Sequence, residues 1–227
     1  MTFDDIPRSA WTSGGRILAQ HDARATYYLS GDLCGRVLEG REHYRREDVK
    51  AMVAEGHEIG SHLFHHLSTL SLSAARIRRE IVQNDQFLQE VTGLALGPQS
   101  FAYPYGEISI AAKWLCNHRF KSSRSVMAGL NSAGTDSDQL RILPIDNAFA
   151  DPAGFVSILQ TAAQNSAWVI ALAHGVDDTG HPYSCPPRAA GDPAIPGKGS
   201  RSGHPNRERS DERALGPAPV RGWSLMG

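Results

Sequence analysis

Apolar and polar positions between Arg24 and Ser166 alternate between short apolar runs and longer segments with helical spacing. The apolar runs predict short strands, and apolar residues three and four apart predict helices. The predicted strands are 25–29, 57–60, 100–103, 120–126, 140–145 and 168–173. The predicted helices are 47–55, 74–92, 109–118 and 154–164. Ser73 is the expected N-cap of the longest helix, and Gly93 follows its last residue.

The strand and helix patterns follow one another in the order strand, helix, strand, repeated about six times. Such alternation predicts an α/β fold with a parallel sheet and outer helices, either open or closed into a barrel. In a parallel barrel, chemistry takes place at the C-terminal ends of the strands. Residues that follow the predicted strands are therefore the first candidates for a functional site.

Composition changes abruptly near Ser184. Residues 184–227 hold 7 of the 13 prolines, 7 glycines, 6 arginines and only four Ile, Leu or Val residues. Such a segment cannot bury enough apolar surface to offset the entropy lost on ordering, so we expect it to be disordered. Two alternatives stay open, namely a tail that binds a partner and a stretch read in a different frame from the domain.

Overall composition excludes few classes of protein. The 227 residues are 41% hydrophobic and 21% charged, as in an ordinary globular protein of one large or two small domains. A balance of 23 Lys and Arg against 24 Asp and Glu disfavours nucleic-acid binding, which normally needs a basic surface. Cys34, Cys116 and Cys185 are too few for a disulfide framework.

No segment of the sequence has the pattern of a membrane span or a secretory signal. The longest apolar run, 168–173, is too short to cross a bilayer. The first ten residues lack the basic and apolar regions of a secretory signal. We therefore expect a cytoplasmic protein without a membrane span.

Four polar clusters stand at the ends of predicted strands. They are adjacent carboxylates at Asp4 and Asp5, a histidine pair at His62 and His66, a Pro-Tyr-Gly turn at 104–106, and His174 directly after a strand. Two histidines four residues apart share one face of a helical turn and can bind one metal ion. His65 is worse spaced from His62, and we expect it to be structural. Each cluster alone is more often structural than functional, whereas their conjunction in this order is specific.

This conjunction resembles the polysaccharide deacetylase family, also called carbohydrate esterase family 4 or the NodB homology domain. TFDD at 2–5 resembles the first family motif, and the histidine pair within 56–66 resembles the second. FAYPYG at 101–106 resembles one variant of the third motif, and LAH at 172–174 resembles the fifth. The resemblance covers residues 1–183 and implies a distorted (β/α) barrel there, with 184–227 as a separate tail.

The resemblance also implies roles for the motif residues. Asp5, His62 and His66 would bind one divalent metal ion, and two imidazoles with one carboxylate suit zinc, cobalt or nickel. Asp4 would be the general base for the attacking water, and His174 the general acid for the departing amine. The backbone N–H of Tyr105 would donate to the tetrahedral oxyanion.

The activity implied is that of a hydrolase which removes N-acetyl groups from an amino sugar, an oligosaccharide or a polysaccharide. Two other functions stay open, namely hydrolysis of a non-sugar amide on the same fold and a catalytically silent metal- or sugar-binding module. The sequence does not define the substrate, the acyl group, the physiological metal or the oligomeric state.

The chain departs from the family pattern at several positions. Residue 63 is Leu where Ser or Thr is usual, and Ala102 stands where many members carry an Arg that pairs with the base. The Asp-Trp pair of the fourth motif is not evident, and Arg141 and Asp146 are the nearest candidates for tuning His174.

The ends of the expected barrel also depart from the pattern. TFDD normally ends a strand, yet only Met1 precedes it here. The other end of the barrel runs into the atypical segment 184–227. We therefore expect a barrel that is incomplete at both ends, and the silent binding module is favoured if such a barrel cannot hold Asp4 and Asp5.

Overall fold

The computed structural model describes residues 1–147 and 152–187. Seven parallel strands form a closed barrel in the order β1-β2-β5-β6-β7-β8-β9. Their bounds are Thr2–Asp4 (β1), Thr26–Leu29 (β2), Glu58–Ser61 (β5), Ser100–Ala102 (β6), Ser122–Ala128 (β7), Leu140–Pro144 (β8) and Ala171–Ala173 (β9). The predicted (β/α) barrel is confirmed.

The barrel closes through β1, so the expectation that it is incomplete at both ends is wrong. On one side β1 pairs with β2, where Thr2 lies opposite Thr26. On the other side β1 pairs with β9, where Thr2 lies opposite Leu172. The Thr2 hydroxyl donates to the carbonyl oxygen of Ala171 across the same seam, at 3.0 Å. The three residues of β1 are thus enough to pair with both β2 and β9.

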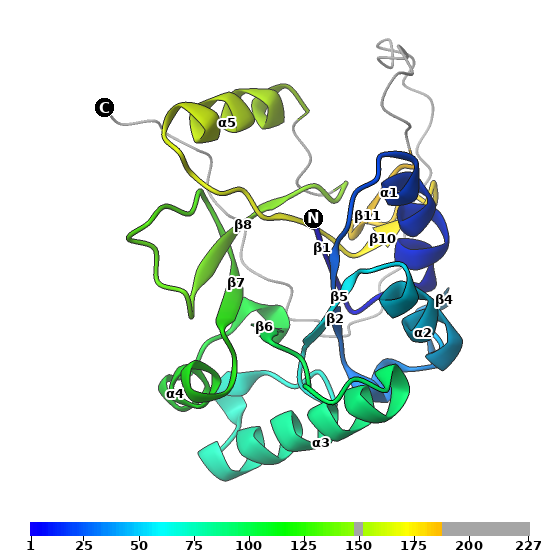
Figure 1. The fold of residues 1–227 in the computed structure, drawn as a ribbon, viewed down its shortest axis with the longest axis vertical. Coiled ribbons are helices and arrows are strands. Elements are labelled where there is room, and N and C mark those ends of the chain that lie inside the picture. Colours follow the sequence, from blue (N-terminus) through cyan, green and yellow to red (C-terminus); the bar gives the residue numbers. More distant parts are fainter. Residues whose placement is uncertain (148–151, 188–227) are drawn as a thin grey trace, which may run out of the picture. The chain divides into compact units, whose positions relative to one another are not determined.

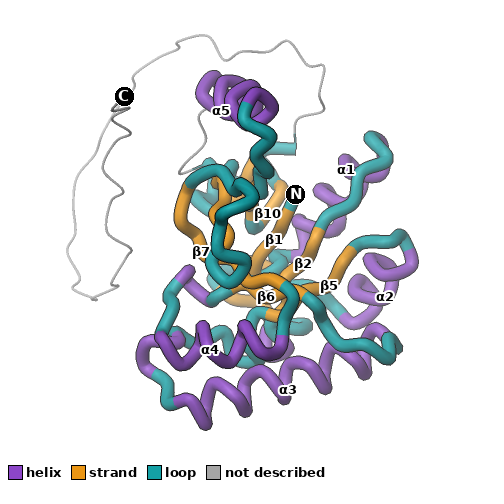
Figure 2. Tube along the Cα trace, turned by 60° about the vertical axis from the view of Figure 1, so that its left-hand side comes forward, coloured by secondary structure: helices purple, strands orange, loops and turns teal. Residues whose placement is uncertain are grey.

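Helices lie outside the ring of strands (Figures 1 and 2). The longest, α3 (Ala74–Thr92), begins after Ser73, whose hydroxyl accepts from the Arg76 N–H, and ends at Gly93 with φ of 69°. Both ends agree with the prediction. The other helical segments are a π-helical stretch at Ala10–Gly15, α1 (Arg16–Gln20), α2 (Arg46–Ala54), α4 (Ile110–Arg119), α5 (Pro152–Gln164) and short 3-10 turns at Gly31–Leu33, Thr69–Ser71 and Pro104–Gly106.

Two small sheets add to the barrel. β3 (Val37–Leu38) and β4 (Arg41–Glu42) form an antiparallel pair, and β10 (Gly175–Val176) pairs with β11 (Ser184–Cys185). The Ser184 hydroxyl accepts from the Arg41 guanidinium at 3.0 Å. Residues 184 and 185, which the sequence assigns to the tail, thus belong to the folded part. Residues 188–227, where the rest of the predicted tail falls, lie outside the described residues.

Alternation along the strands separates an apolar outer face from a polar interior. The rings of Phe3 in β1 and Tyr27 in β2 stack at 5.1 Å and belong to a core cluster with residues of α2 and α3. Side chains alternate along a strand, so the next residues, Asp4 and Tyr28, point to the other face. There both meet the buried side chain of Arg124 from β7.

The predicted strand 168–173 is correct only in its second half. Trp168 is 57% exposed and pairs with Asn131 at an isolated bridge outside the barrel.

Within the described ranges, we find no helix with the length and apolar character needed to span a membrane.

Candidate active site

The two carboxylates at the end of β1 point in different directions. Asp4 is 3% exposed and forms a buried ion pair with Arg124. Asp5 has a φ of 57°, a left-handed conformation that few residues other than glycine adopt. This turn directs the Asp5 carboxylate toward His62 and His66, whose Nε2 atoms lie 3.5 and 3.0 Å from Asp5 Oδ1.

His62 and His66 come from the loop after β5. Leu63 and His66 have φ of 58° and 52°, so the loop turns back and brings the two rings to a centroid distance of 4.8 Å. The expectation that the pair shares a helical turn is wrong, because an α-helix requires negative φ at every residue. His62 Nδ1 lies 2.7 Å from the carbonyl oxygen of Ala102. A proton on Nδ1 donates to that carbonyl and leaves the Nε2 lone pair facing Asp5.

Asp5, His62 and His66 fit a divalent cation. Their ligand atoms lie within 4.8 Å of one another, and no other such group of three is present in the part of the chain that the structure describes. Asp5 Oδ1 is buried without a hydrogen-bond partner among the described residues. Burial lowers the pKa of His62 to about 4, so its imidazole is neutral and able to coordinate a metal near pH 7. A buried carboxylate oxygen facing imidazole nitrogens is a donor set typical of zinc.

His65 points away from this group. Its backbone N–H donates to the buried carboxylate of Glu80 at 2.9 Å, and its Nδ1 lies 3.0 Å from the same carboxylate. Arg76 forms an ion pair with Glu80 at 2.7 Å. His65 therefore ties the histidine loop to α3.

His174 follows β9 and is held by Asp146. Its backbone N–H donates to Asp146 Oδ1 at 3.1 Å, and its Nδ1 lies 2.7 Å from Oδ2. Burial alone would lower the pKa of His174, but the hydrogen bond to Asp146 and the charges of Asp4, Asp146 and Asp5 outweigh it and raise the pKa. Of the two residues singled out for tuning His174, Asp146 contacts it, whereas Arg141 lies exposed on β8.

Tyr105 stands on the solvent side of the same group. It has a φ of 58° within the Pro104–Gly106 turn and is 61% exposed. Its ring centroid lies 4.5 Å from that of His66. The turn after β6 thus brings Tyr105 beside the predicted metal ligands.

The family model described as "Polysaccharide deacetylase" matches residues 1–118, more than half of the chain. The chain belongs to the polysaccharide deacetylase family. The matched residues run from β1 into α4 and include Asp4, Asp5, the histidine pair and Tyr105. His174 lies beyond the match.

Curated relatives of this chain include two deacetylases from different sources. A peptidoglycan-N-acetylglucosamine deacetylase of Bacillus cereus is 28% identical over 153 residues, which cover 66% of this chain and 51% of the relative. A chitin deacetylase of Pestalotiopsis sp. is 31% identical over 93 residues, which cover 41% of this chain and 30% of the relative. The chain thus spans about half the length, or less, of these curated relatives.

Solved structures of two other proteins share the fold. The Streptococcus pyogenes deacetylase PplD, in complex with acetate, superposes with a TM-score of 0.59 and 18% identity, over 69% of this chain and 68% of that chain. IcaB from Ammonifex degensii gives a TM-score of 0.57 and 24% identity, over 71% and 70% of the two chains. At these identities the likeness shows the fold.

Two departures from the polysaccharide deacetylase pattern have a structural outcome. Leu63, which replaces the usual hydroxyl residue, is fully buried in the core beside α3 and α4. Ala102 leaves no arginine on β6, yet Asp4 has a guanidinium partner, Arg124 of β7. Our sequence reasoning missed Arg124, although its period-2 position in a predicted strand, two residues after Ser122, was a usable signal.

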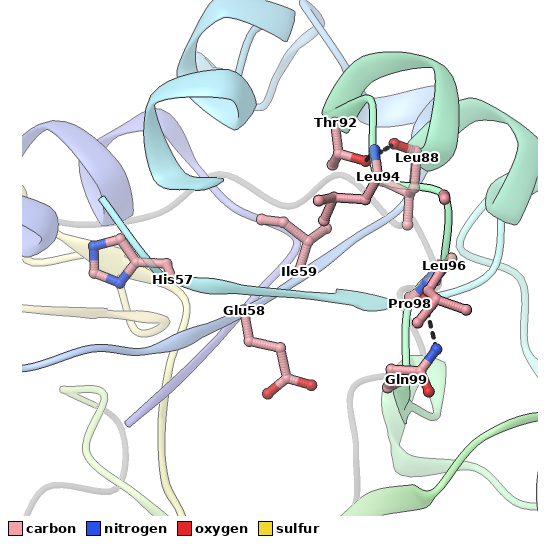
Figure 3. A pocket seen from close by; sticks show the side chains of 11 residues that line it. His57, Glu58, Ile59, Leu88, Thr92, Leu94, Leu96, Pro98 and Gln99 are labelled. Carbon is pink, nitrogen blue, oxygen red and sulfur yellow. Dashed lines mark hydrogen bonds between the residues drawn. The ribbon is translucent and has the colours of Figure 1, made fainter. Parts of the chain in front are cut away.

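A cavity of about 440 Å³ at the other end of β5 is separate from this site (Figure 3). Apolar side chains such as Ile59, Leu88 and Leu94 line much of it. The cavity lining includes Glu58, the first residue of β5, whereas His62 follows the last residue of that strand. None of the predicted site residues lines this cavity.

Proposed function

We propose that this chain is a metal-dependent hydrolase that removes N-acetyl groups from an amino sugar in an oligosaccharide or polysaccharide. The observation that carries the proposal is the convergence of Asp5, His62 and His66 beside a buried second carboxylate, that of Asp4. The names of the curated relatives, which are deacetylases of peptidoglycan N-acetylglucosamine and of chitin, support the substrate class.

Asp5, His62 and His66 would hold the metal ion. Two nitrogens and one oxygen favour zinc, with cobalt or nickel as alternatives, and three protein ligands leave positions open for water and substrate. The bound ion would polarise the acetamide carbonyl and lower the pKa of a water molecule.

Asp4 and His174 would move the protons. Asp4 would accept a proton from the attacking water, because an ionised carboxylate is a pure acceptor. His174 would donate a proton to the departing amine, and its raised pKa favours the protonated imidazole that this role requires. The backbone N–H of Tyr105, beside His66, would donate to the oxyanion.

Acetate release from a chitooligosaccharide tests the proposal. The purified chain, loaded with zinc, is incubated with N-acetylated chitopentaose, and acetate and free amines are both quantified. We expect equal amounts of the two, loss of release after chelation, and recovery on adding zinc. Asp4→Asn should retain zinc and lose about 10²-fold or more in kcat.

Other results would point to the alternative functions. Ammonia release from a small amide, without acetate release, would indicate hydrolysis of a non-sugar C–N bond. Stoichiometric zinc with no hydrolysis of either substrate would indicate a binding module.

A further inference from the structure

Ile6 directly follows the predicted metal ligand Asp5 and has an unusual backbone conformation. Its φ is 45° and that of Asp5 is 57°, so two consecutive residues lie in the left-handed region. For a β-branched residue such a φ is a steric outlier, because its Cβ crowds the following carbonyl oxygen. Pro7 adds to the cost, since a proline favours extended backbone with negative φ at the residue before it. A conformation of this kind persists only where the surrounding structure holds it.

The backbone of Ile6 is held on both sides. Its N–H donates to the carbonyl oxygen of Asp4, which closes a three-residue turn centred on Asp5. Its carbonyl oxygen accepts from the Tyr44 N–H at 3.1 Å. The peptide groups that flank the turn are therefore fixed.

Tyr44 is itself held by hydrogen bonds on other sides. It is fully buried, and its hydroxyl donates to the carbonyl oxygen of Ser30 at 2.8 Å. Its own carbonyl oxygen accepts from the Gly35 N–H at 2.8 Å. An antiparallel bridge between Pro7 and His43 lies beside the bond to Ile6. The segment between β4 and α2 thus supports the turn.

The side chain of Ile6 provides an apolar anchor for the turn. It is 0% exposed and belongs to the core cluster that also contains Leu33 and Tyr44. Removing its apolar surface from water is favourable and offsets the cost of the positive φ. At the other side of the turn, Asp5 Oδ1 lies 3.0 Å from His66 Nε2. One turn therefore joins a buried isoleucine to a carboxylate that faces a predicted ligand.

We propose that Ile6 is the positioning residue of Asp5. Burial of the Ile6 side chain holds the backbone in the left-handed turn, and the turn directs the Asp5 carboxylate toward His62 and His66. The site is thereby preorganised, so a cation binds without first ordering the carboxylate. The proposal rests on the proposed function, in which Asp5 binds the metal ion.

The experiment compares four variants with the wild type. They are Ile6→Ala, Ile6→Gly, Ile6→Val and the control Met52→Ala, at a fully buried position of α2 in the same core cluster. For each full-length protein we measure the melting temperature without zinc. Zinc affinity is then measured by competition with a chelator, at a temperature at which every variant is folded.

We expect Ile6→Ala to bind zinc at least about tenfold more weakly than the wild type, because the turn keeps its steric cost and loses its anchor. Met52→Ala should lower the melting temperature as well, since both changes leave a cavity in the core. Its zinc affinity should stay within about twofold of the wild type. A merely structural role of Ile6 would give the two variants the same zinc affinity.

Glycine at position 6 provides a second signature. Glycine adopts a positive φ without steric cost, so Ile6→Gly should bind zinc more tightly than Ile6→Ala and melt at a higher temperature. At a buried position with negative φ the order of melting temperatures is the reverse, because glycine loses more conformational entropy on folding than alanine.

Three results would overturn the proposal. They are a folded Ile6→Ala variant with zinc affinity within about twofold of the wild type, equal losses of zinc affinity in Ile6→Ala and Met52→Ala, and weaker zinc binding by Ile6→Gly than by Ile6→Ala. If neither Ile6→Ala nor Ile6→Gly folds, Ile6→Val decides. A loss of zinc affinity of more than about twofold in Ile6→Val then supports the proposal, and an unchanged affinity overturns it.

Failure of the proposed function is distinguishable from failure of this inference. Zinc-bound wild-type protein that releases no acetate would contradict the proposed function and leave the zinc comparison intact. Wild-type protein that binds no zinc would contradict the metal site itself. The melting temperatures of the zinc-free proteins then test the anchored turn, because Ile6→Gly above Ile6→Ala supports it and the reverse order overturns it.

Discussion

At the residue scale, the positive φ of Asp5 gives the side chains of Asp4 and Asp5 different directions. Asp4 keeps the register of β1 opposite Tyr28, and its carboxylate stays inside the barrel. The positive φ of Asp5 turns the next carboxylate toward two imidazoles. Adjacent carboxylates in a sequence therefore need not share a role, and here only one of them lies among the predicted metal ligands.

Removing either predicted histidine ligand should abolish stoichiometric zinc binding. His62→Ala and His66→Ala each delete one of three donors whose atoms lie within 4.8 Å of one another. His65→Ala is the matched control, since its ring contacts Glu80, and it should keep its zinc. Zinc content by mass spectrometry checks all three. One tightly bound zinc in both His62→Ala and His66→Ala would contradict the site.

The pH profile should depend on Asp146. In the proposed mechanism His174 donates a proton and must be protonated to do so, so activity should fall as the pH rises through the pKa of His174. Asp146 helps to raise that pKa, and Asp146→Asn should lower it and move the alkaline limb of kcat/KM to lower pH. The control Asp136→Asn, at an exposed carboxylate paired with Lys113, should leave the limb in place. An unshifted limb in Asp146→Asn would contradict the assignment.

Spacing and resemblance together singled out the candidate site residues, and the structure brings three of them, Asp5, His62 and His66, together. The residues that contact and orient the candidates were harder to find. Arg124 reaches Asp4 across 120 positions of sequence, a partnership that no local pattern contains. Glu80 lies on the buried side of α3. The apolar stripe of this helix predicted the helix itself but did not indicate a buried carboxylate.

At the element scale, α3 holds two loops of the site through side chains one turn apart. The amide group of Asn84 donates to the Leu29 carbonyl and to the Ser61 hydroxyl, and its oxygen accepts from the Gly31 N–H. Glu80 holds the backbone of His65. The ends of β2 and β5 are thus fixed by one helix, and these contacts stabilise a loop that contains two left-handed residues, Leu63 and His66.

Glu80→Ala should destabilise the histidine loop. The substitution leaves the His65 N–H without its acceptor and removes a buried partner of Arg76, at a cost of about 2 kcal/mol. We expect a lower melting temperature and weaker zinc binding, measured by competition with a chelator. Glu90→Ala is the control on the same helix, because Glu90 is an exposed partner of Arg46. Equal zinc affinity in the two variants would refute the role of Glu80.

The elements that sequence patterns missed depend on tertiary contacts. The segment Ala10–Gly15 is helical although it shows no apolar period, and a Cβ on Gly14 would lie 3.0 Å from Val176 and 3.2 Å from Phe3. Close packing against distant segments, rather than local propensity, therefore shapes it. The predicted strand 168–173 begins before β9, which covers Ala171–Ala173. An apolar run does not show which of its residues pair with a neighbouring strand.

At the scale of the whole molecule, closure of the barrel was the feature predicted least well. The alternation of strands and helices predicted the architecture correctly. Whether the first strand meets the last depends on pairing between residues far apart in sequence, such as Thr2 and Leu172. Local patterns carry no information on that pairing.

Two truncations should define the end of the folded unit. Ser184 is fully buried, and its carbonyl oxygen accepts from the Asn147 N–H at 2.8 Å. Deleting 184–227 should therefore lower the melting temperature by more than about 5 °C, whereas deleting 188–227 should change it by less than about 2 °C. Thermal unfolding of both proteins checks this. An equal loss in both would show that residues beyond 187 stabilise the domain.

The pairing of β1 with β9 also predicts an order of assembly. The hydrogen bond from Thr2 to Ala171 joins residues 169 positions apart, whereas Asp5, His62 and His66 lie within the first third of the chain. Contacts that close longer loops cost more entropy and form later. A refolding chain should therefore bind zinc before β9 pairs with β1 and brings His174 close to Asp4. Zinc binding would then precede the recovery of acetate release, and closure of the barrel would be the slow step between the two.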